Sequence, residues 1–179
     1  MKTKQILSLL IFPILSHAAE LDVNLEKSRI QVDAKATGHS FTGTLASYTA
    51  RVEGDSVSNK PVSFDLDWSF KNLKTADPKR DKEMMAWLGG GDPKGNFHFS
   101  KTWVDQQGKN HASGNLSING ISKPISFPYT VKKEGDWVSI DGKVEMDYRN
   151  FDLPMIRAMA VMTVDPKLVV RFHIVGQIK

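Results

Sequence analysis

The sequence contains no cysteine among its 179 residues. Disulfides, thiolate nucleophiles and cysteine-ligated metal sites are therefore excluded, as is a lipid-anchored precursor that needs a cysteine at its cleavage site. Basic side chains form no stripe: the formal net charge is +4, but charges of both signs are scattered, so no nucleic-acid partner is expected. No long apolar run occurs after residue 18, so no integral membrane segment is expected either.

One apolar run does stand at the N-terminus. Lys2 and Lys4 precede ILSLLIFPILS, which is too short to span a bilayer, and the small residues of SHA follow it. This pattern predicts a signal peptide over residues 1–18, cleaved after Ala18, and export to the periplasm. A membrane anchor is the alternative interpretation. The remaining residues, 19–179, have the length of a single domain.

The remainder of the chain is dominated by alternation of apolar and polar side chains. In VSFDLDWSF, Val62, Phe64, Leu66, Trp68 and Phe70 are apolar and the residues between them are polar. A period of two predicts a strand with one dry face. A break in phase near Ala46 predicts a bulge in the second strand. Eight such strands are expected, over residues 29–36, 40–52, 62–70, 95–104, 113–118, 125–131, 137–146 and 167–178.

The turns between these strands are short, which predicts an antiparallel arrangement. Asn119-Gly120 is a strong hairpin signal, and KKEGD and DQQGKN are polar turns that contain glycine. Eight such strands form a sandwich or a closed barrel. The small inward residues favour a barrel with room for one ligand, although they are equally compatible with bends or crowded strands; they are Ala34, Ala36, Gly43, Gly114, Gly142 and Gly176.

The segment RDKEMMAWLGGG interrupts the strand pattern. Asp77 is a helix cap and Pro78 suits the first helical position, so a helix is predicted over residues 78–88 and ended by Gly89–Gly91. Its apolar face carries Met84, Trp87 and Leu88. We expect this helix to cross the mouth of the barrel as a lid, with the three glycines as a hinge. Arg80 and Asp81 are then expected at the rim, where they anchor the helix or meet a headgroup.

A second exception is FDLPMIRAMAVMTVDP, which is apolar on nearly all sides. Five of the six methionines after residue 18 lie in these two exceptional segments. Methionine suits a surface that accepts a flexible chain, although its commoner role is to fill gaps in a core. Arg157 needs Asp81 or Asp152 as a partner if it is buried, or it binds an anionic headgroup, or it faces solvent.

A copper-handling protein is the alternative function. If the second segment is helical, Met155, Met159 and Met162 lie on one face, where soft thioethers suit Cu(I), and His39 can join them.

Catalysis is not predicted. The chain has no nucleophile-elbow motif, and histidines 39, 98, 111 and 173 are scattered without metal-ligand spacing. His98 and His173 alternate with apolar neighbours and are expected to point outward. We therefore expect no enzyme activity, no metal and no cofactor other than a bound lipid.

The order of the motifs GHSFTGTL, KNLKTADPKRDKEM, GNFHFSK, SGNLSINGISKPISFP, MDYRNFDLP and VDPKLVVRFHIVG resembles that of the YceI-like family of secreted, lipocalin-like proteins. The resemblance covers essentially the whole chain after residue 18, although YRNFDLP and the methionine-rich segment depart from the family pattern. It implies an eight-stranded antiparallel barrel, all-β apart from a short helix and a methionine-rich loop or helix near the mouth of an elongated hydrophobic cavity. The implied ligand is a polyisoprenoid, an isoprenoid quinone or a fatty-acyl amphiphile, and a homodimer is possible.

The pattern and the resemblance together predict twelve ligand-binding residues. They are Phe41, Phe64, Leu66, Trp68, Phe70, Met84, Trp87, Leu88, Phe99, Met155, Arg157 and Met159. A barrel filled by its own side chains, with a structural or partner-binding role, is the third possibility.

Overall fold

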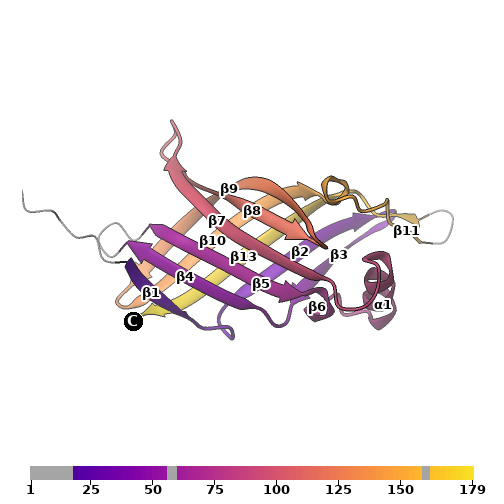
Figure 1. Ribbon diagram of the computed structural model, residues 1–179, viewed down its shortest axis with the longest axis horizontal. Helices are drawn as coiled ribbons and strands as arrows, with labels where there is room; N and C mark the ends of the chain where they lie inside the picture. Colours follow the sequence, from indigo (N-terminus) through magenta and orange to yellow (C-terminus); the bar gives the residue numbers. More distant parts are fainter. Residues whose placement is uncertain (1–17, 56–59, 159–161) are drawn as a thin grey trace, which may run out of the picture.

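The fold is known from a computed structural model that describes residues 18–55, 60–158 and 162–179. It is an elongated β-barrel with one α-helix at one end (Figure 1). The elements are β1 (Ala18–Val23), β2 (Arg29–Ala36), β3 (His39–Leu45), β4 (Thr49–Asp55), β5 (Pro61–Ser69), η1 (Phe70–Asn72), β6 (Leu73–Lys74), α1 (Pro78–Trp87), β7 (Lys94–Val104), β8 (Asn110–Ile118), β9 (Ile121–Glu134), β10 (Trp137–Asp147), η2 (Tyr148–Phe151), β11 (Arg157–Ala158), β12 (Met162–Thr163) and β13 (Lys167–Ile178).

The barrel closes because β13 uses both of its edges. One edge pairs with β10, and the other pairs with β2 near its start and with β1 near its end. Strands β1 and β2 are thus two halves of one interrupted barrel strand. Strands β3 and β4 likewise form one interrupted barrel strand, and so do β5 and β6. At one end of the barrel β4 pairs with β1 and β5, and at the other end β3 pairs with β2 and β6. The predicted closed eight-stranded antiparallel barrel is confirmed, although β1 itself was not predicted.

Two irregularities change which side chains face inward. The register between β4 and β5 shifts at Glu53/Gly54, where Val62 has no partner on β4. Because one extra residue reverses the alternation, Pro61 is buried and Val62 is 47% exposed. The expectation that Val62 faces inward is therefore wrong. A second shift, at Phe99/Lys101 of β7, places Thr102 opposite the buried Ala112 of β8.

Strand β9 changes its pairing partner along its length, which leaves a gap in the hydrogen-bonded ladder between β9 and β10. Its residues 121–128 pair with β8, and its residues 129–134 and β10 form the next hairpin, so within the described residues β10 beyond Gly142 pairs only with β13. Pro124 and Pro128 explain the change of partner. Proline has no N–H to donate, and pairing with β8 runs unbroken across Pro124 and ends with Pro128. The edge that lacks donors therefore faces β10.

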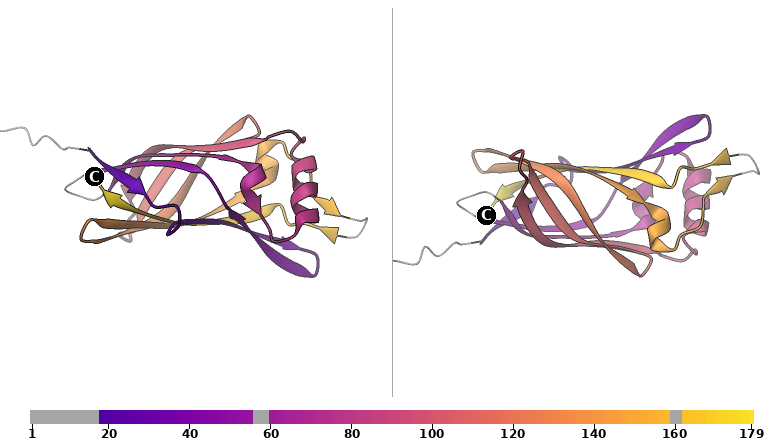
Figure 2. Two further views of the ribbon diagram at one scale, coloured as in Figure 1. Left: turned by 90° about the horizontal axis from the view of Figure 1, so that it is seen from below. Right: turned by 90° about the horizontal axis from the view of Figure 1, so that it is seen from above.

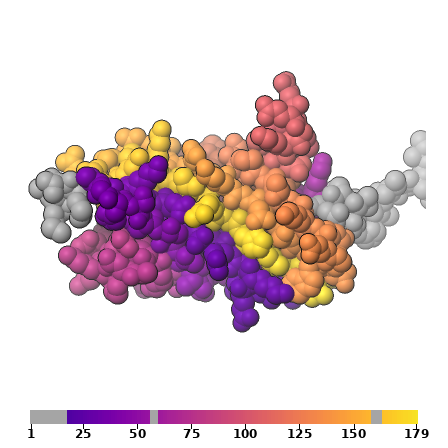
Figure 3. Space-filling model, turned by 180° about the vertical axis from the view of Figure 1, so that it is seen from behind, coloured from indigo at the N-terminus to yellow at the C-terminus, as the bar shows by residue number. Residues whose placement is uncertain are grey.

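The hairpin of β7 and β8 leaves the barrel at the other end of this wall. Figure 3 shows it standing clear of the body of the molecule. Trp103 stacks on His111 across the hairpin, with 5.3 Å between the ring centroids. Trp103 and Val104 remain exposed there, at 38% and 47%.

Helix α1 lies across the barrel end opposite the C-terminus (Figure 2). Asp77 caps it as predicted: its side chain accepts hydrogen bonds from the backbone N–H groups of Lys79 and Arg80 at 3.0 and 3.1 Å. Gly89, Gly90 and Gly91 all have positive φ, from 68° to 93°, where other residues are strained. They end the helix, and the N–H of Gly89 donates to the carbonyl of Ala86.

Arg80 and Asp81 hold the start of α1 against the barrel. Asp81 accepts from the backbone N–H and the hydroxyl of Thr75 at 3.0 and 2.6 Å. Arg80 donates to the hydroxyl and the carbonyl of Thr75 at 2.9 and 2.8 Å, and its guanidinium lies 4.2 Å from the centroid of the Phe41 ring. Thr75 is only 6% exposed. The pair therefore anchors the start of the helix, which is one of the two roles expected for it.

None of the helices formed by the described residues has the length and hydropathy of a bilayer-crossing segment.

Candidate functional site

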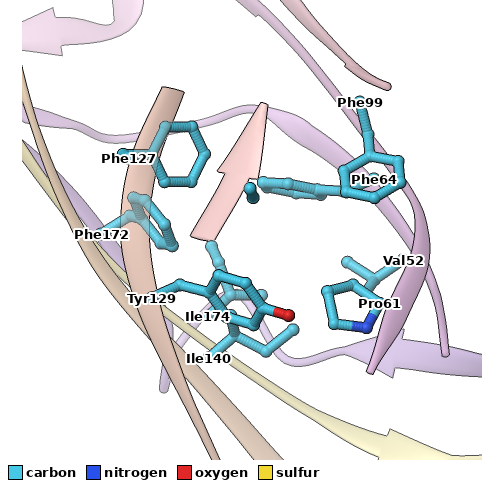
Figure 4. A pocket seen from close by; sticks show the side chains of 10 residues that line it. Val52, Pro61, Phe64, Phe99, Phe127, Tyr129, Ile140, Phe172 and Ile174 are labelled. Carbon is cyan, nitrogen blue, oxygen red and sulfur yellow. The ribbon is translucent and has the colours of Figure 1, made fainter. Parts of the chain in front are cut away.

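The barrel contains a narrow apolar cavity (Figure 4). Its lining residues lie in the parts of their strands that are remote from α1. Its volume is about 20 Å³, which is room for about one water molecule. Its wall is formed by residues of seven strands: β4, β5, β7, β8, β9, β10 and β13. The cavity therefore lies on the barrel axis and not in a surface groove. The lining residues are Val52, Pro61, Phe64, Phe99, Ala112, Phe127, Tyr129, Ile140, Phe172 and Ile174.

Four phenylalanine rings fill the middle of the barrel beside this cavity. Phe64, Phe97, Phe127 and Phe172 contact one another in a closed circuit, with centroid separations of 5.8, 5.7, 5.4 and 6.5 Å around it. The rings are tilted or edge-to-face, which is the favourable geometry for aromatic pairs. We call these four residues the phenylalanine cluster. It separates the cavity from the α1 end of the barrel.

The small inward residues do not leave the room that the sequence suggested. A methyl group at Gly142 would overlap the ring of Phe172, and one at Gly114 would overlap the ring of Phe97. Gly176 is covered by Leu21 and Gly43 by Leu73. Large side chains from neighbouring strands therefore occupy the space above the glycines, and crowding is the correct explanation of these positions.

Tyr129 brings a polar group into the otherwise apolar lining. The residue is 4% exposed, and its buried hydroxyl makes no hydrogen bond of acceptable geometry within the described part of the chain. Burial raises the pKa of Tyr129, and the Thr102 side chain, which lies close enough to act as a weak hydrogen-bond partner of the hydroxyl, offsets this rise in part. The group therefore remains a neutral phenol at physiological pH, able both to donate and to accept. An unpaired buried hydroxyl costs about 1–3 kcal/mol.

Of the eleven predicted site residues that the structure describes, two line this cavity, Phe64 and Phe99. Leu66, Phe70 and Leu88 are buried in the hydrophobic core. Trp68 is partly buried and lies on Gly95. Phe41 is half-buried beneath Arg80. The predicted site residues near α1 are therefore separated from the cavity by the phenylalanine cluster.

The three residues predicted on the inward face of α1 pack against the barrel. Leu88 is 2% exposed, and Met84 and Trp87 are partly buried against the core. Trp87 donates its indole N–H to the carbonyl of Pro154 at 2.9 Å and meets Tyr148 edge-on at 5.2 Å. The carbonyl of Leu88 accepts from Asn119 at 3.2 Å. The C-terminal half of α1 is thus fastened at two points.

The methionine-rich segment is extended where the structure describes it. Strands β11 and β12 form a short antiparallel pair, Arg157 with Thr163 and Ala158 with Met162. The helical spacing on which the copper alternative depended is therefore not formed by the described residues. Met159 lies outside the described residues. Met155 lies 3.7 Å from the Tyr148 hydroxyl, and Arg157 is exposed.

Three histidines pair with aspartates rather than with one another. His98 contacts Asp65 at 2.8 Å, His111 contacts Asp105 at 2.9 Å and His173 contacts Asp141 at 2.7 Å. His98 and Asp65, like His173 and Asp141, are cross-strand neighbours, which places the expected outward histidines on the outer surface. Among the described residues, no group of three or more histidine and carboxylate side chains is placed to hold a metal.

The residues that prediction missed had a visible signal. Phe127 and Tyr129 lie on the inward face of the alternating stretch 125–131, and Phe172 and Ile174 on that of 167–178. Alternation identifies inward residues but not their depth along the barrel axis, which depends on register and tilt.

Comparison with known proteins agrees with this architecture. The YceI-like domain matches residues 21–176, which is nearly all of the chain that the barrel occupies. The chain belongs to the YceI-like family. Among proteins of curated function, none matches it at a significant level.

Two crystal structures show the same fold. BcnA of Burkholderia cenocepacia is 20% identical, with a TM-score of 0.75, over 87% of this chain and 100% of that protein. The YCEI protein of Campylobacter jejuni is 16% identical, with a TM-score of 0.61, over 76% of this chain and 84% of that protein. At these identities the likeness concerns the lipocalin-like barrel alone.

Proposed function

We propose that this YceI-like protein is a periplasmic carrier or storage protein that holds one long-chain amphiphile inside the barrel. The ligand class is a polyisoprenoid, an isoprenoid quinone or a fatty-acyl lipid. Export by a signal peptide over residues 1–18 and a free domain over 19–179 belong to the same proposal, as does the absence of catalysis. The observation that supports it is an apolar cavity on the axis of a closed barrel, lined from seven strands.

The cavity must enlarge to accept a chain. At about 20 Å³ it holds no more than a water molecule, so the rings of the phenylalanine cluster have to turn aside. Two features make this feasible. The rings of Phe97 and Phe172 lie over Gly114 and Gly142, which have no side chains to interlock with them. Each methylene that the ligand buries contributes about 0.8 kcal/mol, so a chain of a dozen carbons offsets about 10 kcal/mol of rearrangement.

The experiment is to purify the protein from the periplasm, extract it with organic solvent and analyse the extract by mass spectrometry. A stoichiometric long-chain lipid is expected. A titration with a fluorescent prenyl alcohol measures affinity for the stripped protein. Phe127→Trp is the matched variant, because a larger ring in the phenylalanine cluster narrows the path and is expected to weaken binding. A lipid-free extract together with no saturable binding would leave the filled structural barrel as the correct description.

A further inference from the structure

The Tyr129 hydroxyl is a polar group in the apolar cavity lining that packing does not explain. Tyr129 lies on β9, next to the point where β9 leaves β8 and pairs with β10. Figure 4 shows its oxygen pointing into the space bounded by Val52, Pro61 and Ile140. The other nine described residues of the lining present apolar side chains to this space.

Two observations distinguish this hydroxyl from the other buried polar atoms. In the described part of the chain, the Tyr48 hydroxyl and the Asn96 carbonyl oxygen are also buried without a hydrogen bond, but neither residue lines the cavity. An ordered water does not satisfy the Tyr129 hydroxyl well, because a buried water needs two to four polar partners and the described lining offers one. The hydroxyl is covered by its neighbours in this structure. When the lining opens for a ligand, it offers one donor and acceptor to a molecule that is otherwise apolar.

We propose that Tyr129 binds the uncharged polar group of the ligand, such as the oxygen of an alcohol, ketone or ester. This proposal rests on the lipid-carrying function proposed above. The ligand enters with this group first, and its apolar tail extends past the phenylalanine cluster toward α1. The same lining disfavours a carboxylate or phosphate, because among its described residues there is no cation to compensate a desolvated anion. Tyr129 is thus a specificity-determining residue that selects neutral amphiphiles.

Three probes with the same sixteen-carbon chain test this assignment: hexadecan-1-ol, hexadecanoate and hexadecane. Each is titrated into stripped wild-type protein and into Tyr129→Phe, which removes only the hydroxyl. One hydrogen bond changes affinity by about two- to tenfold, so Tyr129→Phe is expected to weaken binding of the alcohol by about that factor and to leave hexadecane unchanged. Hexadecanoate is expected to bind wild type more weakly than the alcohol.

Tyr48→Phe is the matched control, because it deletes a buried, unpaired hydroxyl outside the cavity and is expected to leave the affinity for the alcohol unchanged. A second readout is the NMR spectrum of protein labelled at the tyrosine ring carbon that bears the hydroxyl, which contains three tyrosine signals. The Tyr129 signal is expected to shift with the alcohol and not with hexadecane. Equal affinity of wild type and Tyr129→Phe for the alcohol, or tighter binding of hexadecanoate, overturns the assignment. Failure of all three probes to bind wild type instead overturns the carrier function on which it rests.

Discussion

The pairing of Gly142 with Phe172 gives a direct test of how the barrel interior is filled. The two residues are cross-strand neighbours on β10 and β13, and a methyl group on Gly142 would overlap two atoms of the Phe172 ring. Gly142→Ala alone is expected to cost about 1–3 kcal/mol through overpacking. Phe172→Ala alone is expected to cost about 3–5 kcal/mol, because it removes a ring from the phenylalanine cluster.

In the double variant the new methyl group occupies part of the space that the ring vacated. The loss of unfolding free energy is therefore expected to fall short of the sum of the single losses by about 1–2 kcal/mol, within the range seen for residues in contact. Urea unfolding at 25 °C measures all four proteins. Gly54→Ala is the control partner, since among the described residues its methyl group meets the Lys60 carbonyl alone, at 3.5 Å. Its effect is expected to add to that of Phe172→Ala. Additivity of the Gly142 and Phe172 changes within about 0.5 kcal/mol would refute the packing described here.

Three further predictions concern the α1 end and the surface. Trp87→Ala removes the hydrogen bond to Pro154 and is expected to speed transfer of a fluorescent prenyl alcohol to vesicles in stopped flow more than it lowers the melting temperature; the exposed Trp103→Ala should leave the transfer rate alone. Asp81→Ala leaves the buried N–H of Thr75 unpaired and is expected to cost about 1–3 kcal/mol in urea unfolding; an unchanged midpoint would show that the anchor is unimportant. The pKa of Asp92 is lowered to about 2 by hydrogen bonds from Lys94 and Ser69, so its stabilising effect is present above about pH 4 and is lost as the pH falls toward 2. Asp92→Asn should flatten that fall in the urea midpoint, and an identical pH profile would contradict the assignment.

The strands were predictable because one face of each is dry, and period-two alternation reports that directly. The alternation failed at Val62, where a bulge depends on the register with β4 and leaves no local mark in VSFDLDWSF. Strand β1 was missed because it is only the short outer half of an interrupted barrel strand. That half is recognisable only once β13 is seen to pair with it.

Helix α1 was predictable to within one residue, 78–88 against the observed Pro78–Trp87, because its signals are local. Asp77 and Pro78 mark its start, and three glycines mark its end. The function assigned to those glycines was less secure. A glycine suits both a hinge and a left-handed cap, and the positive φ of all three is that of a left-handed cap. Hinge motion at these residues stays a prediction.

The cavity was the least predictable part. The inward glycines suggested space, but whether a glycine leaves a void depends on which side chain of the neighbouring strand leans over it. Phe172 over Gly142 and Phe97 over Gly114 are consequences of register, which no single strand encodes. The unpaired hydroxyl of Tyr129 is likewise visible only when its surroundings are known.

A crystal structure of the stripped protein grown with hexadecan-1-ol tests the central claim most directly. The account predicts continuous density for the chain along the barrel axis, displaced rings in the phenylalanine cluster and the alcohol oxygen within hydrogen-bonding distance of the Tyr129 hydroxyl. A barrel interior unchanged from the ligand-free protein, with Phe64, Phe97, Phe127 and Phe172 in contact at saturating alcohol, would contradict it.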